Sequence, residues 1–301
     1  MRVIVLGAAG MLGHKLLQRL RTHFEVAGTI RDPEPNAELR RVLSDVKLYP
    51  EVAANNLPSL ERAIDHWEAQ VVLNCIGIVK QRAAATDPIL SIAINSLFPH
   101  QLAQLTAARG AKLIHFSTDC VFSGRRGNYV EDDLPDPVDL YGRSKLLGEL
   151  PTPGTLTLRM SVIGRELRGH LGLIDWFLSQ RGRPVKGFAG ALYTGLTTIA
   201  TADLIAQLIR AHLTLEGVWH VSGDPISKFD LLQMVNRVYG LGWEIARDKA
   251  FLCDRRLDSS RFRRHIGWQP PSWEEMICSM HSDEETYAEV RVEAEATNSS
   301  H

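Results

Sequence analysis

The sequence predicts an α/β protein with a doubly wound parallel sheet and a smaller C-terminal lobe. Two observations lead to this fold class. Short apolar runs of β type alternate with helical stretches through the first half of the chain, and the length of 301 residues suits one α/β domain with a modest second lobe. Alternation of this kind implies right-handed βαβ units, and therefore a parallel sheet that is covered on both faces.

Each element is predicted from its apolar pattern and from the residues at its ends. Asp87 and Pro88 supply an N-cap and a first helical residue, and Gly110 suits the end of the same helix. Glycine and proline punctuate residues 182–195, which we expect to form a loop. The predicted strands are residues 2–6, 25–30, 71–75, 112–117, 155–160 and 217–221, and the predicted helices are residues 11–22, 57–67, 87–109, 172–181, 199–212 and 229–239.

We expect three parts along the chain. Residues 1–160 form a dinucleotide-binding domain that carries the catalytic residues. Residues 161–282 form mainly a substrate-binding lobe, although some of its segments return to the first sheet. Residues 283–301 are acidic and then polar, and we expect them to form a flexible tail.

The composition excludes several other classes of protein. The net charge of −1 suggests neither nucleic acid nor a membrane surface as a partner, and no apolar run is long enough to span a membrane. A strand that begins at residue 2 leaves no room for a signal peptide, and we expect a cytoplasmic protein. The cysteines form no Cys-x-x-Cys pair, so we expect neither a metal site nor a disulfide framework; they are Cys75, Cys120, Cys253 and Cys278.

A glycine-rich turn follows the first predicted strand. Its backbone N–H groups, and those of the helix that it opens, can approach a pyrophosphate closely. The spacing is G-x-x-G-x-x-G, and its position between a buried strand and an amphipathic helix makes it a dinucleotide site rather than a mere tight turn. We therefore assign to the cofactor Gly7, Gly10, Met11, Leu12 and Gly13.

The choice between the two nicotinamide cofactors is made at the end of the second strand. Arg31 stands first there, and an arginine at this place accommodates a 2′-phosphate. We therefore favour NADP(H), with NAD(H) as the alternative, because Asp32 could bind a free ribose hydroxyl instead. Arg31 could also be no more than a solvated loop charge.

A hydroxyl, a phenol and an ammonium complete the expected site. Thr118 directly follows the strand predicted at residues 112–117. Tyr141 and Lys145 lie four residues apart and share a helix face. The ammonium is expected to lower the pKa of the phenol and to hold the nicotinamide ribose. The phenol can then protonate a carbonyl oxygen, which Thr118 orients. These residues suit the reduction of a carbonyl by a nicotinamide.

These motifs resemble the extended short-chain dehydrogenase/reductase family, and within it the dTDP-4-dehydrorhamnose reductase branch. The stretches that carry the resemblance are residues 74–77, 116–124, 141–149 and 158–161, together with Asn95. The resemblance implies a Rossmann domain and Thr118, Tyr141 and Lys145 as the catalytic set. It also implies a nucleoside-diphosphate sugar with a 4-keto group as substrate. We further expect a possible homodimer, and cofactor contacts from Asn74, Cys75, Gly77 and Ser117.

Several loops depart from the pattern of that branch, so the nicotinamide chemistry is better supported than the sugar. The loop after residue 77 reads Ile-Val-Lys-Gln, and residues 254–261 replace the usual Arg-Pro-x-x-Ser segment. We expect Lys80 and Gln81 to face the sugar and at least one nearby arginine to pair with the diphosphate, unless the arginines are a solvated cluster. The residues assigned to the substrate are Lys80, Gln81, Asp119, Cys120, Arg255, Arg256 and Arg261.

Two other functions stay open. The same fold supports epimerisation or dehydration of sugar nucleotides, but dehydratases of this kind usually place acidic residues straight after the catalytic hydroxyl, whereas Asp119 is followed by Cys120. A non-catalytic, dinucleotide-binding regulatory subunit is the third reading, and the intact Thr118, Tyr141 and Lys145 argue against it.

Overall fold

The computed structural model of the chain describes residues 1–80, 86–284 and 287. Within them, a seven-stranded sheet has the order β10-β6-β5-β4-β1-β2-β3, and every neighbouring pair is parallel. This sheet confirms the predicted fold class. Its strands are β1 (Arg2–Leu6), β2 (Glu25–Thr29), β3 (Lys47–Tyr49), β4 (Val71–Asn74), β5 (Lys112–Phe116), β6 (Thr155–Arg159) and β10 (Gly217–His220).

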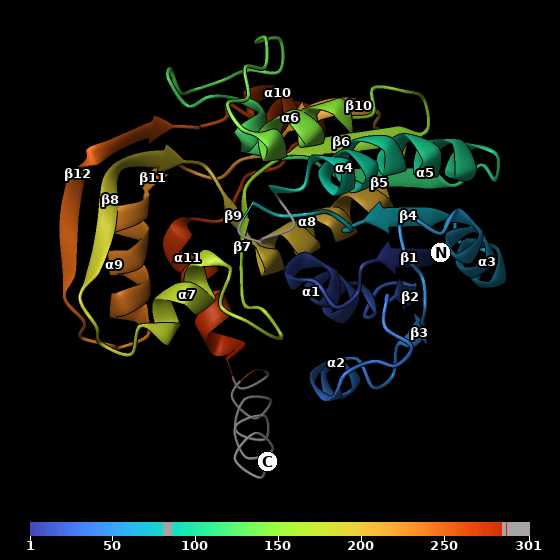
Figure 1. The fold of residues 1–301 in the computed structure, drawn as a ribbon, viewed down its shortest axis with the longest axis horizontal. Helices are drawn as coiled ribbons and strands as arrows, with labels where there is room; N and C mark the ends of the chain where they lie inside the picture. Colours follow the sequence, from blue (N-terminus) through green and yellow to red (C-terminus); the bar gives the residue numbers. More distant parts are fainter. Residues whose placement is uncertain (81–85, 285–286, 288–301) are drawn as a thin grey trace.

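Helices cover both faces of the sheet (Figure 1). One face packs against α1 (Met11–Leu20), α2 (Ala37–Val42) and α8 (Thr198–Ala211), whose apolar side chains share a core with the strands. The other face packs against α3 (Leu57–Trp67) and α5 (Phe98–Ala107). Burial on both sides explains why β1 and β4 read as nearly continuous apolar runs rather than as alternating ones.

The strand order reverses at β1. The chain runs outward from β1 to β2 and β3, and then returns to place β4 on the opposite side of β1. The carboxyl ends of β1 and β4 diverge at this switch point, which is where open α/β sheets bind their ligands. The glycine turn follows β1, and the segment that begins with Cys75 follows β4.

The helix predicted over residues 87–109 is interrupted. It consists of α4 (Pro88–Ser91), a π-helical segment η2 (Ile92–Leu97) and α5. The side chain of Asn95 accepts a hydrogen bond from the Ile78 N–H at 2.8 Å and donates to the Ile78 carbonyl at 3.0 Å and to Ser144 Oγ at 3.2 Å. π-Helical segments within helices often occur at functional sites. Through Asn95, this one connects the segment after β4 to α6 (Leu140–Leu147).

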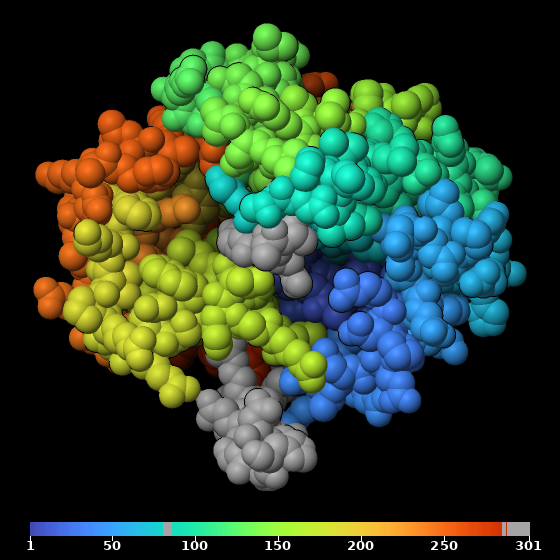
Figure 2. All heavy atoms as spheres, viewed as in Figure 1, coloured from blue at the N-terminus to red at the C-terminus, as the bar shows by residue number. Residues whose placement is uncertain are grey.

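A smaller lobe lies beside the sheet, and the molecular surface is hollowed between this lobe and the segment after β4 (Figure 2). Its three-stranded sheet has the order β11-β8-β12 and is covered by α9 (Figure 1). The prediction of a loop over residues 182–195 is wrong, because most of these residues form β8, which pairs with β12 some 60 residues later in the chain. The lobe and its connections contain β7 (Val162–Ile163), α7 (Leu173–Ser179), β8 (Val185–Tyr193), β9 (Leu196–Thr197), β11 (Ile226–Ser227), α9 (Lys228–Val238), β12 (Ile245–Asp254), α10 (Ser260–Ile266) and α11 (Trp273–Ser282).

Two segments beyond residue 160 pack with the large sheet. α8 packs on α1, and β10 is an edge strand of the large sheet, so both return to the first domain. The packed part of the chain also extends beyond residue 282: Asp283 pairs with Lys15, and Tyr287 is 1% exposed. The rest of the tail expected over residues 283–301 lies outside the described residues. In the described part of the chain, no helix is long and apolar enough to cross a membrane.

Candidate active site

The glycine turn has the geometry that a pyrophosphate needs. Gly7 has a φ of +83°, a conformation that favours glycine. A Cβ atom at Gly13 would lie 2.2 Å from the Gly7 carbonyl oxygen, so only glycine allows this close packing. Gly10 is the N-cap of α1 and provides no side-chain cap, which leaves the first N–H groups of the helix, at Met11 and Leu12, available to an anion. The turn therefore fits a dinucleotide.

The end of β2 carries an exposed cation. The side chain of Arg31 is 84% exposed, and its Nε lies 3.9 Å from Asp32. That contact is long and exposed, so it leaves the guanidinium free to turn toward a 2′-phosphate. Thr29, just before it, is fully buried and accepts a hydrogen bond from the Gly7 N–H at 3.2 Å, which anchors the glycine turn to β2.

The residues after β4 shape the segment beside the turn. Asn74 is buried; its Oδ1 accepts from the Ile76 N–H at 3.1 Å, and its amide lies 3.1 Å from His115 Nδ1. Asn74 thus positions the segment with its side chain already engaged. Cys75 and Gly77 lie in this segment, and burial raises the pKa of the Cys75 thiol. A Cβ at Gly77 would lie 3.4 Å from Asn95 Oδ1.

The side chain of Ser117 takes part in a buried hydrogen-bond network. Its hydroxyl donates to Glu149 Oε1 at 2.7 Å inside a buried network. Glu149 also forms a bidentate ion pair with Arg159 at 2.8 and 2.8 Å, and Arg159 contacts His220 Nε2 at 3.2 Å. This network joins the ends of β5 and β6 at the carboxyl edge of the sheet, and a contact between Ser117 and the cofactor stays a prediction.

The three expected catalytic residues converge at the ends of β5 and α6. Thr118 caps the short helix η3 (Asp119–Val121), where its Oγ1 accepts from the Cys120 N–H at 3.1 Å. Tyr141 and Lys145 lie on α6, which Asp139 caps through the Gly142 N–H at 2.8 Å. The Thr118 hydroxyl lies close enough to Tyr141 to act on the pKa of its phenol. The hydroxyl and the phenol are therefore adjacent, as a shared carbonyl substrate requires.

The electrostatics of the pair differ from expectation. Burial raises the pKa of Tyr141 well above its usual value, and the nearby Thr118 hydroxyl opposes that rise only in part. The ammonium of Lys145 donates a hydrogen bond to the Phe116 carbonyl at 2.6 Å. Burial lowers the pKa of Lys145 to about 8. Tyr141 is thus protonated at neutral pH, and Lys145 is the group that titrates nearby.

A prediction about pH follows from Lys145. We expect kcat/KM to fall as the pH rises through about 8, because the ammonium is then lost from the folded protein. The folded pKa lies below that of a free lysine, so burial of this charge costs stability below pH 8, and the cost fades between about pH 8 and 10.5. The measurement is a pH–rate profile. Lys145→Arg, which stays charged, should lose this alkaline decline even if its activity is lower; an unchanged decline would assign it to another group.

Three of the residues that the sequence assigns to the substrate lie together beside Thr118: Asp119, Cys120 and Arg255. Thr118 Oγ1 donates to Asp119 Oδ1 at 3.2 Å. Burial raises the pKa of Asp119, and the nearby Arg255 opposes that rise. Arg255 is partly buried and donates from Nε to the Phe122 carbonyl at 3.0 Å, which holds its guanidinium at the site. Burial also raises the pKa of the Cys120 thiol to about 12, so this cysteine is a neutral lining residue.

Lys80 contacts the residue that caps α6, whereas Arg256 and Arg261 have partners elsewhere. Lys80 forms an ion pair of 2.7 Å with Asp139, the residue that caps the helix of Tyr141. Arg256 is paired with Asp254 at 2.6 Å, and Arg261 stacks over the Trp219 ring at 4.1 Å. These contacts leave Arg255 as the cation of the cluster that lies beside Asp119. Gln81 lies outside the described residues.

Tyr193 is a neighbour of the site that the sequence did not single out. It ends β8, its side chain is 6% exposed, and its buried hydroxyl has no hydrogen-bond partner among the described residues. The charge of Asp119 contributes to the raised pKa of Tyr193, which places the two groups in one environment. Residues 182–195 were expected to be a loop, so no pattern pointed to Tyr193; only the pairing of β8 reveals it.

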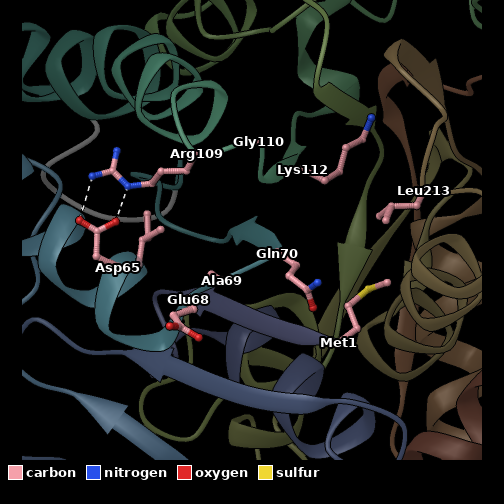
Figure 3. A pocket seen from close by; sticks show the side chains of 10 residues that line it. Met1, Asp65, Glu68, Ala69, Gln70, Arg109, Gly110, Lys112 and Leu213 are labelled. Atoms are coloured by element: carbon pink, nitrogen blue, oxygen red, sulfur yellow. Dashed lines mark hydrogen bonds and ion pairs between the residues drawn. The ribbon is translucent and has the colours of Figure 1, made fainter.

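A hollow of about 570 Å³ lies at the opposite edge of the large sheet (Figure 3). It opens where β1, β4 and β5 begin, beside Met1, Gln70 and Lys112. Its charged groups are paired: Arg109 binds Asp65, as the dashed lines in Figure 3 show, and Lys112 lies 3.7 Å from Glu216. Because the hollow lies where the strands begin, it is remote from the carboxyl edge of the sheet, where the glycine turn and Tyr141 lie. We do not assign the reaction to it.

This fold and this site define an NAD(P)-dependent oxidoreductase of the extended short-chain dehydrogenase/reductase type. Comparison with known proteins is more specific. The chain belongs to the family of the RmlD substrate binding domain, which it matches over residues 1–245.

Two relatives and one solved structure illustrate the match. A probable low-salt glycan biosynthesis reductase, Agl14 of Haloferax volcanii, is 32% identical over 93% of this chain and 97% of its own length. A probable dTDP-4,6-dihydroxy-2-methyloxan-3-one 4-ketoreductase of Streptomyces antibioticus is 31% identical over 79% of this chain and 77% of its own length. The dTDP-4-dehydrorhamnose reductase of Bacillus anthracis, solved with NADP, shares the fold with a TM-score of 0.74 at 21% identity, covering 94% of this chain and 99% of its own.

Proposed function

We propose that this protein uses NADPH to reduce the 4-keto group of a nucleoside-diphosphate sugar, in the synthesis of a deoxysugar or a surface-polysaccharide precursor. The observation that carries the proposal is the adjacency of Thr118 and a protonated Tyr141, at the same sheet edge as a dinucleotide-binding glycine turn. Relatives that act on dTDP-linked keto sugars support the substrate class.

The side chains divide the reaction between them. A bound nicotinamide supplies the hydride. Tyr141 donates its phenolic proton to the keto oxygen as that oxygen becomes an alcohol, and burial keeps this proton on the phenol beforehand. Thr118 donates a hydrogen bond to the same oxygen and fixes its direction. Lys145, held by the Phe116 carbonyl, provides a positive charge next to the nicotinamide ribose.

The test is turnover with NADPH and a panel of 4-keto-6-deoxy sugars linked to dTDP, UDP, GDP and CDP, followed by loss of NADPH absorbance. Stoichiometric oxidation of NADPH with one of these substrates supports a reductase. Conversion of a sugar nucleotide without net NADPH oxidation would point to an epimerase or a dehydratase instead. Tight dinucleotide binding without conversion of any sugar would point to the regulatory subunit.

Arg255 should bind the diphosphate of the substrate. It is partly buried beside Asp119, and its guanidinium can form two parallel hydrogen bonds with phosphate oxygens. We expect Arg255→Ala to weaken binding of dTDP or UDP, without any sugar, by about 10-fold or more. Isothermal titration measures this directly. Arg256→Ala and Arg261→Ala are matched controls and should bind like the parent, because Asp254 and Trp219 already hold those side chains. A parental affinity in the Arg255 variant would move the diphosphate site elsewhere.

Arg31 should determine the preference for NADPH over NADH. Its guanidinium is exposed at the end of β2 and can turn to a 2′-phosphate. We expect Arg31→Ala to raise the Kd for NADPH by about 10- to 100-fold and to leave the Kd for NADH nearly unchanged. Fluorescence titration with both cofactors checks this. Equal effects on the two would show that Asp32 or another group makes the choice.

The location and the assembly are parts of the same proposal. The four cysteines are free thiols, which suits a reducing cytoplasm. A homodimer stays a prediction, and light scattering of the purified protein decides it.

A further inference from the structure

Two adjacent polar residues are buried on the helix that follows the glycine turn. His14 is fully buried and Lys15 is 2% exposed, although both lie on α1, outside the group of Thr118, Tyr141 and Lys145. Their partners come from the end of the described chain. Lys15 pairs with Asp283 at 2.5 Å, and His14 Nε2 lies 2.8 Å from the Tyr287 hydroxyl. A buried polar group needs such partners, because a buried donor or acceptor without a hydrogen bond costs free energy.

The hydrogen bonds through His14 run in one direction. Its Nδ1 lies 2.8 Å from the Gly10 carbonyl oxygen, which can only accept, so Nδ1 carries the hydrogen. Nε2 is then the acceptor, and the Tyr287 hydroxyl donates to it. Burial lowers the pKa of His14 to about 3, which keeps the ring neutral and this arrangement intact at ordinary pH. The chain of donors therefore leads from Tyr287 through His14 to Gly10.

The ring of Tyr287 is held independently of its hydroxyl. The ammonium of Lys15 lies 5.1 Å and the guanidinium of Arg165 5.3 Å from the ring centroid. Cations over an aromatic face attract it electrostatically. Arg165 in turn is paired with the fully buried Asp175 of α7 at 2.9 Å and with Glu284. The ring would thus keep its place if only the hydroxyl were removed.

The acceptor of this chain, Gly10, belongs to the pyrophosphate-binding turn. One side of the turn is anchored where Thr29 accepts from the Gly7 N–H at 3.2 Å. The other side is anchored by the Gly10 carbonyl, which accepts both from the backbone of His14 at 3.1 Å and from its ring. The direction of the Gly10 carbonyl fixes the peptide plane between Gly10 and Met11, and with it the N–H group of Met11 that begins the helix.

We propose that Tyr287, acting through His14, is a positioning residue for the pyrophosphate-binding turn, so that this residue beyond the end of α11 contributes to the cofactor site. The inference rests on the proposed function only in that the turn binds a dinucleotide. It differs from the role of Arg31, because NADPH and NADH share the pyrophosphate and differ only in the 2′-phosphate.

The test is Tyr287→Phe in the full chain. We expect the Kd values for NADPH and NADH to rise by the same factor, about 3- to 10-fold, which is the range for one lost hydrogen bond. KM for NADPH should rise in parallel, while kcat and KM for the sugar nucleotide stay at the parental values. Tyr239→Phe is the matched control: it removes a hydroxyl that donates to Glu284 at 3.1 Å in the same cluster, and it should change neither Kd. His14→Gln, which removes the ring donor to Gly10, should reproduce the effect.

Three results would overturn the inference. Parental Kd values for both cofactors in Tyr287→Phe would show that the hydroxyl does not position the turn. A rise in the Kd for dTDP or UDP as well, with a lower melting temperature, would show general loosening instead. A parent protein that binds neither NADPH nor NADH would overturn the proposed function together with this inference, whereas parental binding with an unaffected variant would overturn this inference alone.

Discussion

Replacing Tyr141 with phenylalanine is expected to lower kcat by about two to four powers of ten, the contribution typical of a positioned general acid. Phenylalanine keeps the ring at the start of α6 and removes only the proton that reaches the keto oxygen. The polar interaction with the nearby Thr118 hydroxyl is lost as well, but the glycine turn is untouched. The Kd for NADPH should therefore stay within about twofold of the parental value, and steady-state kinetics together with fluorescence titration measure both quantities.

A second tyrosine serves as the control for this variant. Tyr49 lies at the end of β3, where its hydroxyl is 2.7 Å from His66 Nδ1, far along the sheet from α6. Tyr49→Phe removes the same atom and should leave turnover at the parental level. Turnover close to parental in Tyr141→Phe would show that another group supplies the proton, and Thr118 would then be the next residue to replace.

The second large effect is expected on stability. Arg159→Met should lower the free energy of unfolding by about 3–5 kcal/mol, because it leaves the Glu149 carboxylate buried without its partner. Both side chains are only 7% exposed, and the pair is bidentate at 2.8 and 2.8 Å. Ser117 and His220 would also lose order, since each contacts one member of the pair. Denaturation in urea, followed by circular dichroism, measures the loss.

The comparison with an exposed pair isolates the effect of burial. Arg19 and Asp203 form a contact of 2.8 Å between α1 and α8, and both side chains are about half exposed. Arg19→Met should therefore cost no more than about 1 kcal/mol. Adding Glu149→Leu to Arg159→Met should recover part of the loss, since the double variant leaves no buried charge unpaired. Equal losses for Arg159→Met and Arg19→Met would contradict the argument.

Local signals predicted much of the fold. β1 and α3 occupy the predicted residues, and the other predicted strands and helices end within a few residues of the observed ones. Each of these elements carries its own apolar period and its own end signals, such as Asn56 and Pro58 at the start of α3. β8 and β12 were missed because they stabilise each other across the lobe, and glycine and proline near β8 looked like a loop.

The sequence by itself determined the chemistry of this protein. Two local patterns carried this information. One is the glycine spacing after a buried strand, and the other is the hydroxyl after β5 together with the phenol and the ammonium on α6. Each pattern can be recognised from neighbouring residues alone. The tertiary structure decided which partner each side chain has. Ser117 donates a hydrogen bond to Glu149, and Lys145 donates one to the Phe116 carbonyl. The Tyr287 hydroxyl forms a hydrogen bond with the buried His14. These contacts join residues up to 273 positions apart. Burial, which raises the pKa of Tyr141 and lowers that of Lys145, likewise exists only once distant elements have packed together.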